Sequence, residues 1–322
     1  ALGTHRHLFG VNQLGSGAQP NHVGGVQGVY GIDPRWLSRD EVDRMRTELI
    51  NRWGVTAPDV AADADGIADE DAAGPVRPFL RKTHEVYRGG APGREPFPLA
   101  ATRAAILVVR DPRDVACSYA PFFGVDLDGA VAAMGRANAG GASSPASSQT
   151  DQPWGTWTSH AASWLADDVP FPVHLVRYED LKRDTVGTLL PIFQAIGLDC
   201  TETQLAAAAE QARFDRLQAS EAERGFRETS KQTRTFFRKG KAGGWSEELS
   251  ESQVAALEAD HDVMMLRLGY ELTTEAAPRA ALAESRASQP RILEPQCEWT
   301  SGDLADEDTW TVHLTSDEVG EL

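Results

Sequence analysis

Arginines stand directly after an apolar run in the first half of this chain. Residues 104–109 are apolar, Arg110 follows, and Asp111 and Pro112 fit the N-cap and first position of a helix. An arginine at a strand-to-helix junction can bind a phosphate, because free backbone N–H groups and the helix dipole attract an anion and the guanidinium adds a charged fork. The same spacing also fits an ordinary turn with solvated arginines.

The sequence Lys82-Thr83-His84 is a second group able to do chemistry, at the end of a strand predicted over residues 78–83. Strands of α/β sheets present ligands at this edge. A histidine titrates near neutrality and can therefore accept a proton from a substrate, a role that contributes about 10²–10⁴ in rate. A lone histidine after a strand also occurs without any catalytic role.

Five short sequences occur in the order typical of one enzyme family. They are RDPRDVACSY from Arg110, GVDLDGAVAAM from Gly124, WTSHAASW from Trp157, LVRYEDL from Leu175 and FFRKGKAGGW from Phe236. Together with Lys82-Thr83-His84 they lie within residues 77–272, where the chain resembles bacterial sulfotransferases that use 3′-phosphoadenosine-5′-phosphosulfate (PAPS).

The resemblance implies a binding site for the nucleotide. By their positions in the motifs, the residues expected to hold the 3′-phosphate are Arg110, Ser118, Arg238, Lys239 and Gly240. Phe214 aligns with an aromatic residue that packs on adenine, and Tyr178 with a tyrosine near the base. Packing in the core explains both rings equally well. Gly240 and Gly243 would let the backbone approach the anion closely.

The resemblance also implies the reaction, an in-line transfer of a sulfuryl group to a hydroxyl or amine of a small molecule. In the family's K-T-H sequence the histidine is the general base, which corresponds to His84, and Lys82 would stabilise the sulfuryl oxygens. PAPS is then the co-substrate and no metal is implied. His160 is a further candidate at the border of the acceptor pocket, whereas Trp157 and Trp164, on the same helix face, fit plain core packing.

Composition limits the partners of the protein. The chain has 322 residues and a net charge of −17, with 48 acidic against 31 basic residues. This balance argues against a nucleic-acid or anionic-membrane surface, which requires dense Lys and Arg. No stretch is long enough to span a membrane, and Cys117, Cys200 and Cys297 are too far apart to form a zinc site or a disulfide framework. We therefore expect a cytoplasmic protein, while its oligomeric state is left open.

The pattern of elements predicts an α/β fold, a three-layer parallel sheet flanked by helices, similar to that of P-loop NTPases. Strands are expected at residues 78–83, 104–109 and 173–178. Residues 1–37 are expected to be irregular. The expected helices cover residues 38–53 (opened by a Ser38–Glu41 capping box), 126–134, 157–164, 203–213 and 252–268.

Three parts are expected along the chain. Residues 1–271 form the sulfotransferase domain, 272–296 a polar linker and 297–322 a short tail that resembles the start of a taurine-dioxygenase-like domain, so that fusion to further domains is plausible. Nothing in residues 1–75 matches the family's Y-P-K-S-G-x-T-W loop for the 5′-phosphosulfate. We therefore expect the domain to be truncated at its N-terminus and to lack its first central strand.

Two alternatives are left open. A non-catalytic nucleotide-binding or scaffold domain of a larger tailoring protein would keep the 3′-phosphate site without the 5′ loop. A different P-loop transferase, such as a small-molecule kinase, is disfavoured because the sequence has no G-x-x-x-x-G-K-[ST] motif. The identity of the sulfate acceptor cannot be read from the sequence.

Overall fold

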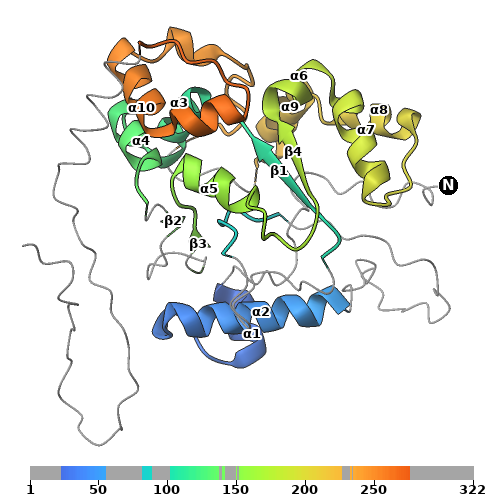
Figure 1. The fold of residues 1–322 in the computed structure, drawn as a ribbon. Helices are drawn as coiled ribbons and strands as arrows, with labels where there is room; N and C mark the ends of the chain where they lie inside the picture. The colour runs from blue at the N-terminus through green and yellow to red at the C-terminus, as the bar shows by residue number, and fades with distance from the viewer. Residues whose placement is uncertain are drawn as a thin grey trace, which may run out of the picture.

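The fold is that of a computed structural model, shown as a ribbon in Figure 1. The structure describes residues 23–55, 82–88, 102–137, 140–141, 150, 152–226, 233 and 235–275. The expected linker and tail, the acidic segment 57–74 and the N-terminal end of the expected strand 78–83 lie outside the described residues, apart from the first residues of the linker.

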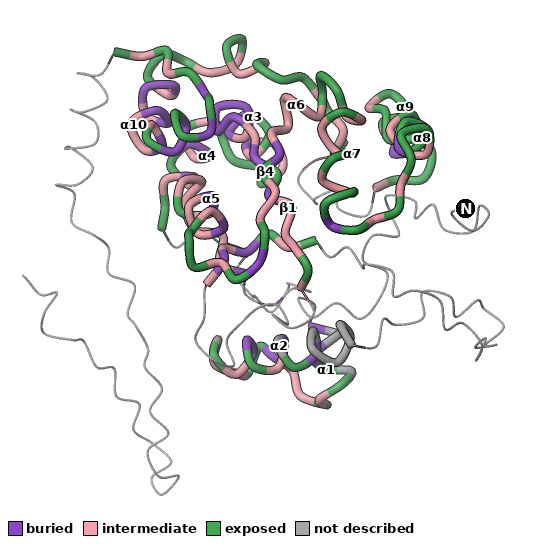
Figure 2. Tube along the Cα trace, turned by 45° about the vertical axis from the view of Figure 1, so that its right-hand side comes forward, coloured by how far each residue is buried: buried purple, intermediate pink, exposed green. Residues whose placement is uncertain are grey.

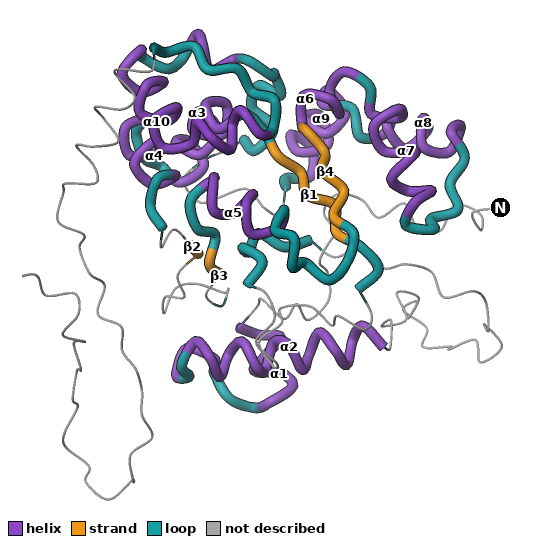
Figure 3. Tube along the Cα trace, viewed as in Figure 1, coloured by secondary structure: helices purple, strands orange, loops and turns teal. Residues whose placement is uncertain are grey.

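Two parallel strands form the centre of the described fold (Figure 3). Strand β1 (Ala105–Val109) pairs along its whole length with β4 (Val173–Arg177), in a register that sets Leu107 opposite Leu175. The chain between them is helical for much of its length, as parallel pairing requires a crossover. The α/β class and two of the three predicted strands are therefore confirmed. A separate antiparallel pair joins β2 (Gly140–Gly141) to β3 (Gln152–Pro153).

Helices lie on either side of the two strands (Figures 1 and 2). On one side are α3 (Pro112–Phe123), α4 (Leu127–Met134), α5 (Trp157–Trp164) and α10 (Glu251–Arg267). On the other are α6 (Tyr178–Arg183), α7 (Thr185–Ala195), α8 (Glu202–Gln211) and α9 (Phe214–Arg224). A short 3₁₀ helix, η4 (Gly244–Glu247), precedes α10.

Capping residues explain why several helices begin where they do. The Asp111 carboxylate accepts the backbone N–H of Arg113 at 2.9 Å and Pro112 occupies the first turn of α3, as the sequence predicts. Thr156 and Ser250 open α5 and α10 with capping boxes. Helix α2 (Arg39–Val55) begins after Ser38, whose backbone N–H donates to Glu41 Oε2 at 2.8 Å, so the predicted capping box is confirmed.

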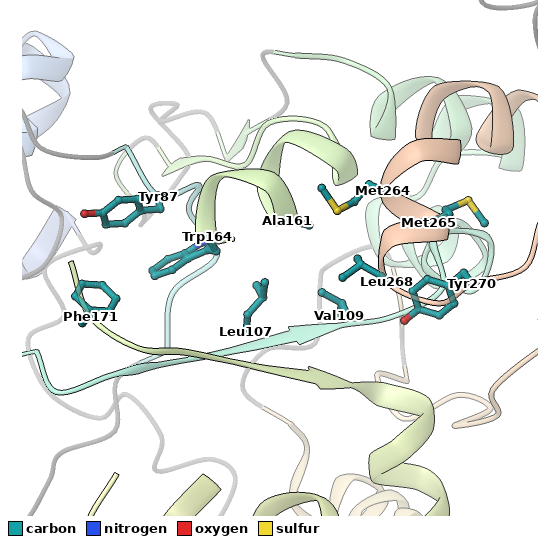
Figure 4. Packing of buried hydrophobic residues seen from close by; sticks show 10 residues of the cluster. All are labelled: Tyr87, Leu107, Val109, Ala161, Trp164, Phe171, Met264, Met265, Leu268 and Tyr270. Carbon is teal, nitrogen blue, oxygen red and sulfur yellow. The ribbon is translucent and has the colours of Figure 1, made fainter. Parts of the chain in front are cut away.

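The main core lies between the strands and helices α5 and α10 (Figure 4). Leu107 and Val109 of β1 pack there against aromatic and sulfur-containing side chains, including Trp164, Met264 and Met265. A second cluster joins α3, α4 and α10 around Ala116 and Leu257. Helix α10 contributes to both clusters and so links β1 and α5 to α3.

Two expectations about local structure are wrong. Residues 1–37 are not irregular throughout, because α1 (Val23–Tyr30) and a 3₁₀ helix, η2 (Pro34–Trp36), lie within them. Val26 is fully buried and the Tyr30 hydroxyl donates to the Met45 carbonyl at 3.2 Å, so packing on α2 overrides the poor helix propensity of three glycines. Lys82 and Thr83, the described end of the expected strand 78–83, are not in a strand.

Candidate nucleotide and acceptor site

Arg110 lies at the junction of β1 and α3, as its position in the sequence predicts. Its guanidinium lies over the ring of Tyr178, the first residue of α6, with 4.7 Å from Cζ to the ring centroid. One terminal nitrogen donates to the Lys241 carbonyl at 2.8 Å. Arg110 Nε is buried and has no hydrogen-bond partner among the described residues. Because buried hydrogen-bond donors normally have an acceptor, this donor favours the binding of an additional acceptor beside Arg110.

The loop of residues 236–245 passes over α3 and is anchored first by α9. The buried Glu221 carboxylate accepts the backbone N–H groups of Phe236 and Phe237, the latter at 3.0 Å. Phe236 also contacts Phe122 of α3, with ring centroids 6.1 Å apart. A carboxylate on one helix and a ring on another therefore fix the start of this loop.

A second buried carboxylate anchors the end of the same loop. Asp114 of α3 accepts the N–H of Gly243 at 2.7 Å and that of Trp245 at 3.0 Å. Burial raises the pKa of Asp114, and these two hydrogen bonds and the nearby Arg110 guanidinium, 3.6 Å away, oppose that rise. The backbone N–H of Gly243 is thus used to hold the loop on α3.

Arg113 ties the loop to the C-terminal helix. Its guanidinium lies 4.1 Å from the centroid of the Trp245 ring and donates to Glu258 of α10 at 2.7 Å. The fully buried Glu258 also accepts hydrogen bonds from the backbone N–H groups of Thr273 and Thr274. The position of the loop therefore depends on α10 and on the segment that follows it.

Between its two anchors the loop carries its cations toward α3. Arg238 donates to the Cys117 carbonyl at 2.9 Å, which brings it beside Ser118, an exposed residue on the second turn of α3. Glu248 pairs with Lys239 at 2.8 Å and with Arg238 at 3.6 Å. Burial raises the pKa of the Cys117 thiol to about 11, and the charges of Glu248 and Asp114 add to this rise.

Gly240 lies at a close approach between the loop and α9. Its φ of +59° is in the left-handed region, and a Cβ here would lie 2.4 Å from the Phe214 ring. The Lys182 ammonium lies 5.8 Å from the centroid of the same ring. Phe214 thus packs on the loop at Gly240, two residues after Arg238, which contacts α3, while Arg110 lies over Tyr178.

Lys82 and His84 lie on an extended segment, residues 82–88, that runs along α5. Both side chains are exposed. The segment is held through its backbone: Val86 N–H donates to the Pro153 carbonyl at 2.9 Å, and the Trp164 indole N–H donates to the Glu85 carbonyl at 3.0 Å. This arrangement fixes the chain while leaving the two candidate catalytic side chains toward solvent.

A buried ion-pair network joins the same segment to α2. Glu85, fully buried, pairs with Arg46, which is also buried and pairs with Asp43 at 3.3 Å. Arg88 pairs with Asp43 at 2.7 Å. Opposite charges buried together satisfy one another, and each becomes costly if its partner is removed. The network therefore fixes the residue that directly follows His84.

Helix α5 connects the two groups of candidate residues. The indole N–H of Trp157 donates to the Arg110 carbonyl at 3.1 Å. One turn later, the ring of His160 is hydrogen-bonded to the backbone of His84 and Glu85, and burial lowers the pKa of this histidine despite those bonds. Three residues correspond to about 4.5 Å along a helix, so the two groups lie at neighbouring turns of α5.

Sequence reasoning identified the cations of this site but missed the acidic residues that position them. Asp114 stands inside the RDPRD motif, which was a usable signal. Glu85 directly follows Lys82-Thr83-His84 and Glu248 stands three positions after Trp245, but neither belongs to a motif. Glu221 and Glu258 lie outside the motifs and carry no local pattern. Among the described helices, none is long and apolar enough to cross a membrane.

Comparisons with known proteins agree with the resemblance. Residues 101–269 match the sulfotransferase domain family. Sulfotransferase 6B1 of Danio rerio is 30% identical over 103 residues, which make up 32% of this chain and 33% of that protein, so the chain spans about a third of the length of this relative.

Two similar solved structures are a mouse sulfotransferase, SULT7A1, complexed with PAP, and a retinol dehydratase in a complex with retinol and PAP. The first is 19% identical, covers 65% of this chain and 70% of its own, and has a TM-score of 0.43. The second is 21% identical, covers 57% and 53%, and has a TM-score of 0.39. Since the family match spans more than half of its residues, the chain belongs to the sulfotransferase family.

Proposed function

We propose that this protein transfers a sulfuryl group from PAPS to a hydroxyl or amine of a small molecule. The observation that carries the proposal is the convergence of Arg110 and the Arg238–Gly240 segment, 128 positions apart at their nearer ends, on the N-terminal half of α3. Cations from two distant segments that meet along the first two turns of one helix suit a phosphate group.

The residues present fit the 3′-phosphate of the co-substrate. Arg110 has a buried Nε without a partner among the described residues, and Ser118 offers an exposed hydroxyl beside the Arg238 contact. Each charge-assisted hydrogen bond to the phosphate would contribute about 1.5–3 kcal/mol. Phe214, which closes over Gly240, and Tyr178, beneath Arg110, are in reach of the same site and would bind the adenine.

His84 would act as the general base and Lys82 as the group that stabilises charge on the sulfuryl oxygens. Both are exposed, so an acceptor can approach them, and the backbone bonds of Glu85 and Val86 hold the segment in place. In-line transfer depends on positioning and on electrostatic stabilisation. Removing the acceptor's proton is then the main chemical step left to a side chain, and His84 is suited to it.

We further propose a cytoplasmic location, supported by cysteines that lie far apart in the sequence, of which Cys117 and Cys200 are free thiols. The alternative function is a non-catalytic nucleotide-binding or scaffold domain within a larger tailoring protein. It would share the phosphate site, so nucleotide binding alone does not separate the two functions.

Turnover separates them. The full chain would be incubated with PAPS and a panel of phenols, alcohols and amines, and the formation of 3′-phosphoadenosine-5′-phosphate (PAP) would be followed. The proposal predicts acceptor-dependent formation of PAP that is reduced at limiting PAPS in the Arg238→Ala variant. Tight binding of PAP without transfer to any acceptor would favour the scaffold function, and absence of binding would contradict the site itself.

A further inference from the structure

Three carboxylates surround the loop of residues 236–245, and they differ in what they bind. Glu221 and Asp114 accept backbone N–H groups, so they determine the path of the loop. Glu248 has a different set of partners. Among the described residues its carboxylate pairs only with two of the loop's three cations: Oε1 with Lys239 Nζ at 2.8 Å and Oε2 with Arg238 at 3.6 Å.

The position of Glu248 is fixed, whereas the two cations reach it from the surface. Its backbone N–H donates to the Trp245 carbonyl at 3.0 Å at the end of η4, and its side chain is 21% exposed. The side chains of Arg238 and Lys239 are 39% and 48% exposed. Long, exposed cations can exchange a carboxylate for another anion with little rearrangement of the loop.

We propose that Glu248 is an affinity-determining residue, an internal anion that competes with the nucleotide's 3′-phosphate for Arg238 and Lys239. This inference rests on the proposed function, because it assumes that these cations bind that phosphate. A phosphate dianion within reach of both would meet the carboxylate at short range, and like charges repel. Binding must therefore exchange the two ion pairs of Glu248 for contacts with the phosphate.

The exchange has a functional consequence. The free-energy gain from the phosphate is reduced by the loss of the internal pairs, so PAP binds less tightly than its set of cations would allow. Among related complexes, a lower affinity comes mostly from a higher dissociation rate. Glu248 would then favour the release of PAP after each transfer.

The test compares Glu248→Gln with Glu247→Gln, a matched control that removes the same charge from the adjacent residue. Glu247 is exposed and no ion pair joins it to the loop cations among the described residues. Calorimetric titration of the full chain should show PAP binding about three- to tenfold more tightly to Glu248→Gln, the range expected when exposed ion pairs no longer compete. Binding of 5′-AMP, which lacks the 3′-phosphate, should change little, and Glu247→Gln should behave as the wild type.

Three results would overturn the inference. Weaker or unchanged binding of PAP by Glu248→Gln would mean that Glu248 positions the cations or has no part in binding. An equal gain in PAP affinity for Glu247→Gln would mean that the effect comes from the overall charge of the protein. If neither the wild type nor the variants bound PAP, the proposed function would fail and the inference with it, so the two failures are distinguishable.

Discussion

The phosphate side and the acceptor side of the candidate site are built in opposite ways. On the phosphate side the side chains themselves are engaged: Arg110 donates to a carbonyl, lies over Tyr178 and faces Asp114, and Arg238 contacts α3 and Glu248. On the acceptor side Lys82 and His84 are exposed, and the protein holds the backbone around them. Neighbouring turns of α5 support both sides.

This difference corresponds to two physical tasks. A nucleotide that is held in the same way in each cycle is best met by cations whose geometry is set in advance. A general base must reach an acceptor that arrives from solvent, so its backbone is fixed while its side chain stays accessible. The comparison predicts that substitutions on the phosphate side change the affinity for the nucleotide, whereas substitutions on the acceptor side change the turnover rate.

The largest effect is expected for His84. If it removes the acceptor's proton, His84→Ala should lower kcat by about 10²–10⁴ with little change in the affinity for PAP. Steady-state kinetics and a PAP titration of the same preparation measure both quantities. His84→Gln should not restore the rate, since an amide is not a base.

Lys82→Ala provides the contrast for that experiment. It should also slow turnover, because stabilisation of charge on the sulfuryl oxygens is lost. Its residual activity should still decrease at acid pH as the wild-type activity does, since His84 is present in both and its protonated imidazole is not a base. A His84→Ala variant that retained most activity and the same pH dependence would place the base elsewhere, and His160 would be tested next.

Loss of the buried ion pair between Arg46 and Glu85, next to His84, should reduce the stability of the fold strongly. Arg46→Ala leaves Glu85 buried without its main partner, which costs about 3–5 kcal/mol of unfolding free energy. A decrease of roughly 6–20 °C in Tm would follow for a domain of this size. Arg44→Ala, an exposed residue of the same helix, is the control. Equal Tm values for the two variants would show that the Arg46–Glu85 pair does not stabilise the fold.

A smaller effect, on pH dependence, is expected for His160. Burial lowers the pKa of its ring, so the folded protein keeps the ring neutral while the unfolded chain takes up a proton as the pH falls. Its contribution to stability is therefore present above about pH 6.5 and is lost as the pH decreases below that value. His160→Gln should flatten this part of the Tm–pH curve. Parallel curves for wild type and His160→Gln would contradict the assignment.

Local patterns were sufficient to predict much of the framework. The Asp111 cap, the Ser38 capping box and strands β1 and β4 depend on neighbouring residues and agree with the structure. Helix α1 was missed because its stability comes from packing of Val26 rather than from helix propensity.

For the site, sequence reasoning identified the candidate cations but not the residues that hold them in place. Glu221 lies 15 positions before Phe236, and Arg46 lies 39 positions before Glu85. No periodic pattern connects such pairs, since only the tertiary fold brings them together. The same reason explains why the hydrogen bond from the Gly243 N–H to Asp114, 129 positions away in sequence, could not be predicted.

The central claim is that Arg110 and Arg238 form one 3′-phosphate site, and a paired titration tests it most directly. Arg110→Ala and Arg238→Ala should each weaken the binding of PAP by at least about tenfold, because each removes a charge-assisted bond of about 1.5–3 kcal/mol. Binding of 5′-AMP to both variants should change little. Calorimetry in which PAP and 5′-AMP lose affinity equally, or in which neither variant weakens PAP, would contradict the claim.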